Sequence, residues 1–187
     1  MLVKCVRKEN ITAAQRGRCL ELMSAERRAS VERITHMPTR ESTLCGEWLA
    51  KTMLSEMSGI PVEEIRLARD ERGKPYAVNL PLYFSISHSG EHVACAVSSV
   101  PVGLDIEEMR DRDPSVASRV CSEEELAFIF DEAEDVLRRF LQVWTAKEAC
   151  VKQTGIGLAG MREADYFALQ PRLESREEDG CIISVVR

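Results

Sequence analysis

Two acidic residues, Asp105 and Glu107, are separated by one residue in the segment VGLDIEE. The apolar residues Val102, Leu104 and Ile106 alternate with them, and a period of two is typical of a half-buried strand. Because alternate side chains of a strand share a face, both carboxylates are expected on the same side. A hard cation such as Mg²⁺ prefers an oxygen-only site of this kind, often shared with a substrate phosphate. Solvated charges on an exposed strand are the alternative interpretation.

A third carboxylate, Glu148, lies downstream in the segment WTAKEACVKQ. The apolar residues Phe140 and Val143, just before this segment, and Val151 within it recur at the spacing of a helix face. Glu148 and Lys152 are four residues apart, so their side chains are neighbours on one side of this helix. Glu148 would complete a three-carboxylate metal site, and Lys152 would bind a phosphate as a point charge. An ordinary exposed Glu–Lys pair is the alternative interpretation.

The elements that must position these residues mix helices with short strands, which predicts an α+β fold rather than a regular βαβ alternation. Apolar spacing predicts helices over about residues 12–34, 39–57 and 134–153, and the capping-box segment SEEE predicts a short helix after residue 122. Strands are predicted at LVKCVRK, IRLAR, LYFSIS, HVACAVSS, VGLDIEE, YFALQ and CIISVVR. Turns are predicted at DERGKPY, HSGE and DRDP, and a polar loop is predicted between the last two strands.

The composition narrows the class of protein. The chain has 187 residues and is 44% hydrophobic, which suffices for one domain or for two lobes that share a core. It has no long apolar run and no apolar signal core near its N-terminus, so we expect no membrane span and a cytoplasmic protein.

The net charge of −6 argues against nonspecific binding of nucleic acid. The seven cysteines show no CxxC spacing, so neither a disulfide framework nor a zinc site is expected.

The charge is unevenly distributed along the chain. Residues 1–40 are rich in Lys and Arg, whereas residues 105–135 are rich in Asp and Glu. A basic part and an acidic part suit a polyanionic ligand on one side and a metal on the other. Solvated helix faces of opposite sign are the alternative interpretation.

Four segments in this order, FSISHSG, VGLDIE, SEEE and WTAKEACVK, resemble the 4′-phosphopantetheinyl transferase family of the single-chain Sfp type. The resemblance is strongest over residues 73–157. It implies two similar α+β lobes, residues 1–100 and 101–187, each with a long helix packed on a small antiparallel sheet. The second lobe would carry the metal site, and coenzyme A would lie between the lobes. Both lobes in one chain predict a monomer.

The resemblance implies transfer of the phosphopantetheine arm of coenzyme A to a serine of an apo acyl or peptidyl carrier protein, with release of 3′,5′-adenosine bisphosphate. Asp105, Glu107 and Glu148 would hold Mg²⁺ on the pyrophosphate, where charge builds as the phosphoanhydride breaks. Lys152 would contact the pyrophosphate region, and Glu148 is also a candidate base for the carrier serine. Glu125 would either orient a water or the serine, or cap its own helix.

The resemblance also assigns residues to the nucleotide end of coenzyme A. Lys74 and Pro75, in the segment RGKPY, match a turn that the family places against the nucleotide. Ser87 and His88, in SISHS, match a pair at a strand end that would hydrogen-bond a phosphate of coenzyme A.

One departure from the family pattern concerns the 3′-phosphate of coenzyme A. The family often has an arginine four residues before a helix glycine, which is Gly46 here, but Ser42 occupies that position. Either Arg40 reaches the 3′-phosphate by another route, or another base such as Lys51 or Arg33 binds it.

Two other functions share part of this pattern. Another metal-dependent phosphoryl enzyme would use the same carboxylates, and product analysis with coenzyme A would separate the two activities. A non-catalytic protein that binds carriers would not need the charged residues at 105, 107, 148 and 152, and their presence argues against this alternative. Carriers of fatty-acid, polyketide and nonribosomal peptide synthesis are all compatible substrates. The resemblance implies an acidic, helical carrier that docks away from residues 105–135.

Overall fold

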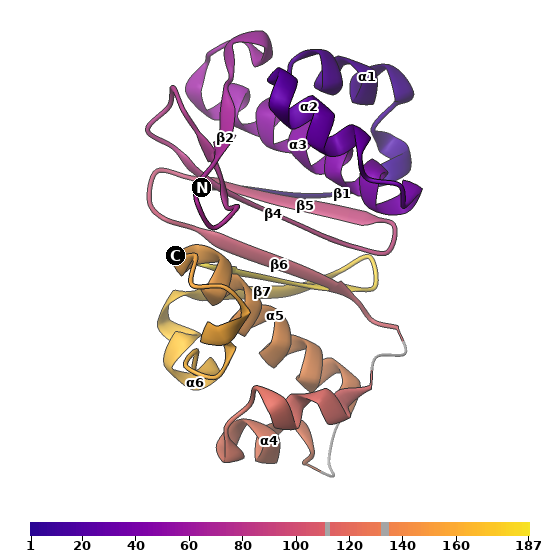
Figure 1. Cartoon of the computed structure of the whole chain (residues 1–187). Helices are drawn as coiled ribbons and strands as arrows, with labels where there is room; N and C mark the ends of the chain where they lie inside the picture. The colour runs from indigo at the N-terminus through magenta and orange to yellow at the C-terminus, as the bar shows by residue number, and fades with distance from the viewer. Residues whose placement is uncertain (111–112, 132–134) are drawn as a thin grey trace. The chain divides into compact units, whose positions relative to one another are not determined.

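The computed structural model describes residues 1–110, 113–131 and 135–187 (Figure 1). The chain divides into two compact units, Met1–Val100 and Pro101–Arg187. Helices pack on a small antiparallel sheet in each unit, which confirms the predicted α+β class. The turn predicted at DRDP and the start of the helix predicted from residue 134 lie partly outside the described residues. No helix in the described ranges is both long and apolar enough to cross a membrane.

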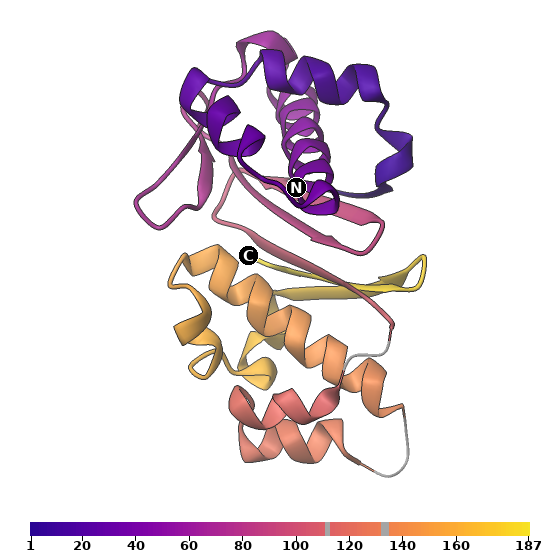
Figure 2. The same cartoon turned by 45° about the vertical axis from the view of Figure 1, so that its right-hand side comes forward.

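The first unit contains a three-stranded sheet and a separate two-stranded ribbon. Its strands and α-helices are β1 (Leu2–Arg7), α1 (Ala13–Glu21), α2 (Ala25–Glu32), α3 (Met37–Ser58), β2 (Leu67–Arg69), β3 (Pro75–Ala77), β4 (Tyr83–Ser89) and β5 (His92–Ser98). The sheet has the antiparallel order β1-β5-β4, and β2 pairs with β3. The helix α3 packs on β4 and β5, and Figure 2 shows the three helices of this unit on one side of the sheet.

The helix predicted over residues 12–34 is two helices in the structure, α1 and α2. Ser24 starts the second one, because its side chain accepts a hydrogen bond from the backbone N–H of Arg27. A serine that satisfies a free N–H group in this way favours a new helix start over continuation. Pro38 lies in the first turn of α3, where an N–H is not required, and Gly59 ends that helix with a φ of 73°.

The second unit contains one three-stranded sheet with a long helix across it. Its strands and α-helices are β6 (Gly103–Glu108), α4 (Glu123–Ile129), α5 (Val136–Thr154), α6 (Tyr166–Leu169), β7 (Leu173–Glu178) and β8 (Cys181–Val186). The antiparallel order is β6-β8-β7. The helix α5 packs on β6 and β8, and Figure 2 shows it crossing the sheet.

Two predictions near the C-terminus were wrong. The segment YFALQ forms the helix α6, because Asp165 caps it by accepting hydrogen bonds from the N–H groups of Phe167 and Ala168. The predicted polar loop forms the strand β7, which pairs with β8 through a turn at Asp179 and Gly180. Most residues of β7 are exposed, so its charges stay in water while its backbone is paired on one side.

Candidate functional site

The two carboxylates of β6 share one face of the strand, but this face is not open to water. All six residues of β6 are buried, whereas the alternation predicted a half-buried strand. The helix α5 covers the carboxylate face: Nζ of Lys152 lies 2.6 Å from Oδ1 of Asp105. A buried carboxylate requires a charged partner, and Lys152 supplies one for Asp105. Glu107 lies on the same face as Asp105, two residues further along.

Glu148 lies on the side of α5 that faces the sheet. The hydroxyl groups of Thr145 on α5 and Ser184 on β8 are 2.7 Å apart, and Ser184 is the strand partner of Asp105. Glu148 follows Thr145 by three residues and precedes Lys152 by four, so all three side chains lie along one stripe of the helix. The fold therefore brings the two predicted site segments, VGLDIEE and WTAKEACVK, into contact.

This seam between β6 and α5 has the donor set of a hard-cation site. Its acidic side chains supply oxygen atoms only, which are the ligands that Mg²⁺ prefers. Asp105 is buried with the ammonium group of Lys152 beside it, so a cation bound here would share this carboxylate with the lysine. The side chain of Lys152 is 31% exposed and has three N–H donors, so it can contact Asp105 and a ligand together.

Glu125 is fully buried at the start of α4. It forms the predicted capping box: its carboxylate accepts from the N–H of Ser122 at 2.8 Å, and its own N–H donates to Ser122 Oγ at 3.2 Å. The carboxylate also accepts from Nζ of Lys147 at 2.7 and 2.9 Å, and from the N–H of Tyr166 at 2.8 Å. The cap is therefore present, while a role for Glu125 in orienting water or the carrier serine stays a prediction.

Lys147 is a residue of this unit that sequence reasoning missed. Its side chain is 1% exposed, and it joins α5 to α4 through Glu125. It lies directly before Glu148, in a stretch where Ala146 and Ala149 are also buried. In the sequence, the small apolar residues on both sides of Lys147 were the signal that this lysine could be buried. A buried lysine in turn needs an acidic partner.

Ser87 and His88 are adjacent residues of β4, so their side chains point to opposite faces of the strand. Ser87 is buried and His88 is exposed. The two side chains therefore do not lie on one face of β4, and their predicted contact with a phosphate of coenzyme A stays a prediction for each residue separately.

The turn that carries Lys74 and Pro75 is held by Asp70. The backbone N–H of Lys74 donates to Oδ1 of Asp70 at 2.9 Å, and the N–H of Asp70 donates to the carbonyl of Lys74 at 3.0 Å. Gly73 has a φ of 83°, which a residue with a side chain adopts at a cost. Partial burial lowers the pKa of Lys74, and the nearby Asp70 opposes this shift. The turn thus has a defined shape before any ligand binds.

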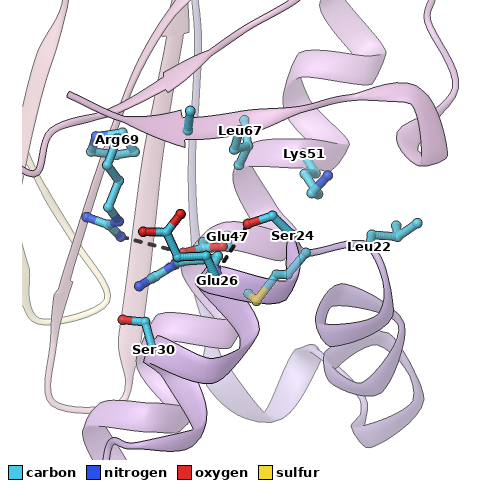
Figure 3. A pocket seen from close by; sticks show the side chains of 12 residues that line it. Leu22, Ser24, Glu26, Ser30, Glu47, Lys51, Leu67 and Arg69 are labelled. Atoms are coloured by element: carbon cyan, nitrogen blue, oxygen red, sulfur yellow. Dashed lines mark hydrogen bonds and ion pairs between the residues drawn. The ribbon is translucent and has the colours of Figure 1, made fainter.

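Pro75 also lines a cavity of about 350 Å³ in the first unit, between α2, α3 and the β2–β3 ribbon (Figure 3). The buried Glu47 lies in this cavity and accepts from Nε of Arg27 at 2.6 Å. Nη2 of Arg69 lies 3.5 Å from the same carboxylate. Two guanidinium groups thus share one buried carboxylate. Sequence reasoning assigned no role to Arg27 or Arg69, because they meet only in the folded unit.

The position that differs from the family pattern, Ser42, is buried in α3. Arg40 lies two residues earlier on the same helix, and residues at this spacing do not share a helix face. Lys51 is buried and donates one of its three N–H groups to the carbonyl oxygen of Ile65. Arg33 is exposed at the end of α2. Of these alternatives, Lys51 is the one that lines the cavity around Glu47.

Two protein-family descriptions match the chain. Residues 101–178 match the 4′-phosphopantetheinyl transferase superfamily. Residues 10–100 match the N-terminal part of 4′-phosphopantetheinyl transferases. The first match includes β6 and α5, and the second includes the cavity around Glu47.

Individual proteins of this family are also similar to the chain in sequence. The chain is 37% identical over 139 residues to the 4′-phosphopantetheinyl transferase psf-1 of Bacillus pumilus, which covers 73% of this chain and 60% of that protein. It is 34% identical over 151 residues to a 4′-phosphopantetheinyl transferase of Bacillus subtilis, covering 80% of this chain and 67% of the relative. For the transferase Sfp of Bacillus subtilis strain 168, the identity is 31% with the same coverage. The aligned part of the chain thus spans about three fifths to two thirds of these relatives.

Proposed function

We propose that this chain, which belongs to the 4′-phosphopantetheinyl transferase superfamily, transfers the 4′-phosphopantetheine arm of coenzyme A to a serine of an apo carrier protein. The serine oxygen forms a new bond to the β-phosphorus of coenzyme A, the one that carries the pantetheine arm. The bond between this phosphorus and the bridging oxygen breaks, and 3′,5′-adenosine bisphosphate leaves with that oxygen. The serine proton passes to a base.

The observation that carries this proposal is the contact between β6 and α5. It places the ammonium group of Lys152 2.6 Å from Asp105 and puts Glu148 on the same side of the helix. We assign Asp105, Glu107 and Glu148 as ligands of Mg²⁺, which when bound would offset the charge that develops on the pyrophosphate. Lys152 would hold a phosphate oxygen with a charge-assisted hydrogen bond, and Glu148 would accept the serine proton.

For the nucleotide end, we propose the cavity around Glu47. Pro75 lines it, and the resemblance already assigned Lys74 and Pro75 to this end of coenzyme A. The cavity is lined by three cationic side chains, Arg27, Arg69 and Lys51, and by two carboxylates, Glu26 and Glu47. Positive charge therefore exceeds negative charge, so the cavity suits an anionic group such as the 3′-phosphate. Ser42 is then not needed as a phosphate ligand.

The direct test is the mass of the carrier after reaction. The protein is incubated with coenzyme A, Mg²⁺ and a panel of apo acyl and peptidyl carriers, and each carrier is weighed. A mass increase equal to the phosphopantetheine arm on one or more carriers is expected, together with release of 3′,5′-adenosine bisphosphate. Asp105→Ala should abolish the increase. A binding protein without activity would give no increase, and a different phosphoryl enzyme would release another product from coenzyme A.

A matched control separates loss of chemistry from loss of fold. Glu174 is an exposed carboxylate on β7 that pairs with Arg187, and Glu174→Ala should leave the transfer rate unchanged. Modification of the carrier by Asp105→Ala at the wild-type rate would contradict the metal assignment.

A further inference from the structure

We infer that Gly103 is a positioning residue for the site between β6 and α5, because its missing side chain lets the two backbones touch. The inference rests on the proposed function, in which Asp105 on β6 acts together with Glu148 and Lys152 on α5. In the sequence, Gly103 is one of the alternating residues of VGLDIEE and the glycine of its GxD pattern, but the alternation by itself does not require a glycine there.

The contact at Gly103 leaves no room for a side chain. A Cβ atom added to Gly103 would lie 1.8 Å from the carbonyl oxygen of Ala149 and 2.5 Å from the backbone nitrogen of Gln153. Real Cβ atoms essentially never approach another atom more closely than 3.0 Å. Both opposing atoms belong to the helix backbone and cannot rotate away. Any side chain at residue 103 must therefore push β6 and α5 apart by more than about 1 Å.

The residues of the site lie directly beside this contact on both elements. On β6, Asp105 is two residues from Gly103 and points to the same face. On α5, Glu148 directly precedes Ala149, and Lys152 directly precedes Gln153. The separation of the backbones at Gly103 therefore sets the separation between the carboxylates of the strand and the charged groups of the helix.

Other closely packed glycines of the chain meet side chains instead. A Cβ atom on Gly46 would lie 2.7 Å from Cγ2 of Ile86. A Cβ atom on Gly160 would lie 2.0 Å from Cδ1 of Ile156, a residue that is exposed and can move its side chain. Gly160 belongs to the same unit as Gly103, and its Cβ would overlap a neighbour to a similar degree, so Gly160→Ala is a matched control.

The first test compares Gly103→Ala with Gly160→Ala in the transfer reaction. A displacement of about 1 Å in a catalytic arrangement can lower the rate about 100-fold, so we expect a loss of this order in kcat for Gly103→Ala. The Gly160→Ala variant should stay within about twofold of the wild type. An unchanged kcat for a folded Gly103→Ala variant would overturn the inference.

A second substitution distinguishes positioning from general damage. Asp105→Glu lengthens the carboxylate arm by one bond of about 1.5 Å, which is similar to the displacement expected from Gly103→Ala. By itself Asp105→Glu should lower kcat, but in the Gly103→Ala background it should recover part of the lost rate. A purely structural effect of Gly103→Ala predicts that the two losses add, and additive losses would count against positioning.

A readout that needs no activity completes the test. Mn²⁺ prefers the same oxygen ligands as Mg²⁺, and its binding can be followed by electron paramagnetic resonance without coenzyme A or carrier. Gly103→Ala should weaken Mn²⁺ binding by about tenfold or more, whereas Gly160→Ala should not; equal affinity in all three proteins would overturn the inference. If the wild type modifies no carrier, the proposed function fails, but this comparison still decides the role of Gly103.

A milder variant covers the case in which Gly103→Ala does not fold. Val186 is the strand partner of Gly103 on β8 and packs in the cluster that contains Ala146 and Ala149 of α5. Val186→Ile adds one methylene group beneath the helix and should lower Mn²⁺ affinity and kcat in the same direction, by a smaller factor. Wild-type values for both quantities would contradict the inference.

Discussion

At the scale of single residues, Lys152 contacts a buried carboxylate while its own side chain stays partly exposed to solvent. Its ammonium group lies 2.6 Å from Asp105, whose side chain is 6% exposed, while the lysine side chain itself is 31% exposed. The lysine thus compensates a buried carboxylate and can still reach a ligand. A surface pair between Glu148 and Lys152, the alternative considered from the sequence, would not require the contact with Asp105.

Lys152→Ala should therefore affect both binding and stability. We expect kcat/KM for coenzyme A to fall at least tenfold, because a charge-assisted hydrogen bond is worth about 1.5–3 kcal/mol. The free energy of unfolding, measured in urea, should fall by about 1–3 kcal/mol, because Asp105 stays buried without this partner. Lys4→Ala is the control: it breaks an exposed pair with Glu56 and should change stability by less than about 1 kcal/mol and leave kinetics unchanged. Wild-type kinetics for Lys152→Ala would contradict its assignment as a phosphate ligand.

At the scale of elements, one buried ion pair holds the helices of the second unit together. Glu125 caps α4, pairs with Lys147 of α5 and accepts from the N–H of Tyr166 at the start of α6. Lys147 is the neighbour of Glu148, so this pair also restrains the segment of α5 that carries the proposed site. The capping box alone, which the sequence indicates, would have linked Glu125 only to its own helix.

The ion pair changes the outcome expected for Glu125→Gln. From the capping box, glutamine should preserve the melting temperature, because it is accepted at that position. In the structure Glu125→Gln leaves the ammonium group of Lys147 buried without its counter-charge, so we expect a loss of about 3–5 kcal/mol in chemical denaturation. Adding Lys147→Met should recover most of this loss. Ser122→Ala, which removes only the cap, should lose about 1 kcal/mol.

The double variant also decides between the two roles of Glu125. A folded Glu125→Gln/Lys147→Met protein that transfers at the wild-type rate would leave Glu125 with a purely structural role. A folded double variant with intact Mn²⁺ binding and a strongly reduced rate would support the orienting role predicted by the family resemblance.

At the scale of the whole molecule, the proposal assigns different parts of coenzyme A to the two units. The first unit would bind the nucleotide end through the cavity around Glu47, and the second would act on the pyrophosphate through the seam of β6 and α5. Substitutions in the two units should therefore change different kinetic parameters.

Arg69→Met tests this division. Removing one guanidinium group should raise KM for coenzyme A about tenfold and should raise KM for 3′-dephospho-coenzyme A much less, because in the proposed binding mode the lost charge would face the 3′-phosphate. The fold should survive, since Glu47 keeps Arg27 as its partner. The Mg²⁺ concentration that gives half-maximal rate should not change. Arg66→Met, an exposed arginine just before β2, serves as the control. Equal changes for both substrates would place the 3′-phosphate elsewhere.

Local patterns in the sequence determined much of this fold. Period-two alternation located β6, apolar spacing located α3 and α5, and Ser122 with Glu125 marked the start of α4. The order of four short segments pointed to the family to which the chain belongs. These signals succeed because each depends on residues within a few positions of one another.

Tertiary structure decided what depends on distant residues. The polar segment that forms β7 was predicted as a loop, but pairing with β8 makes it a strand. The segment that forms α6 was predicted as a strand, but the cap from Asp165 makes it a helix. Whether Asp105 meets water or Lys152, whether Lys147 has a partner, and whether Gly103 leaves room for a side chain are fixed by contacts between elements. The sequence supplies the chemical groups of the site, but only the packing of α5 on the sheet sets the distances between them, because periodicity along one element carries no information about its separation from another.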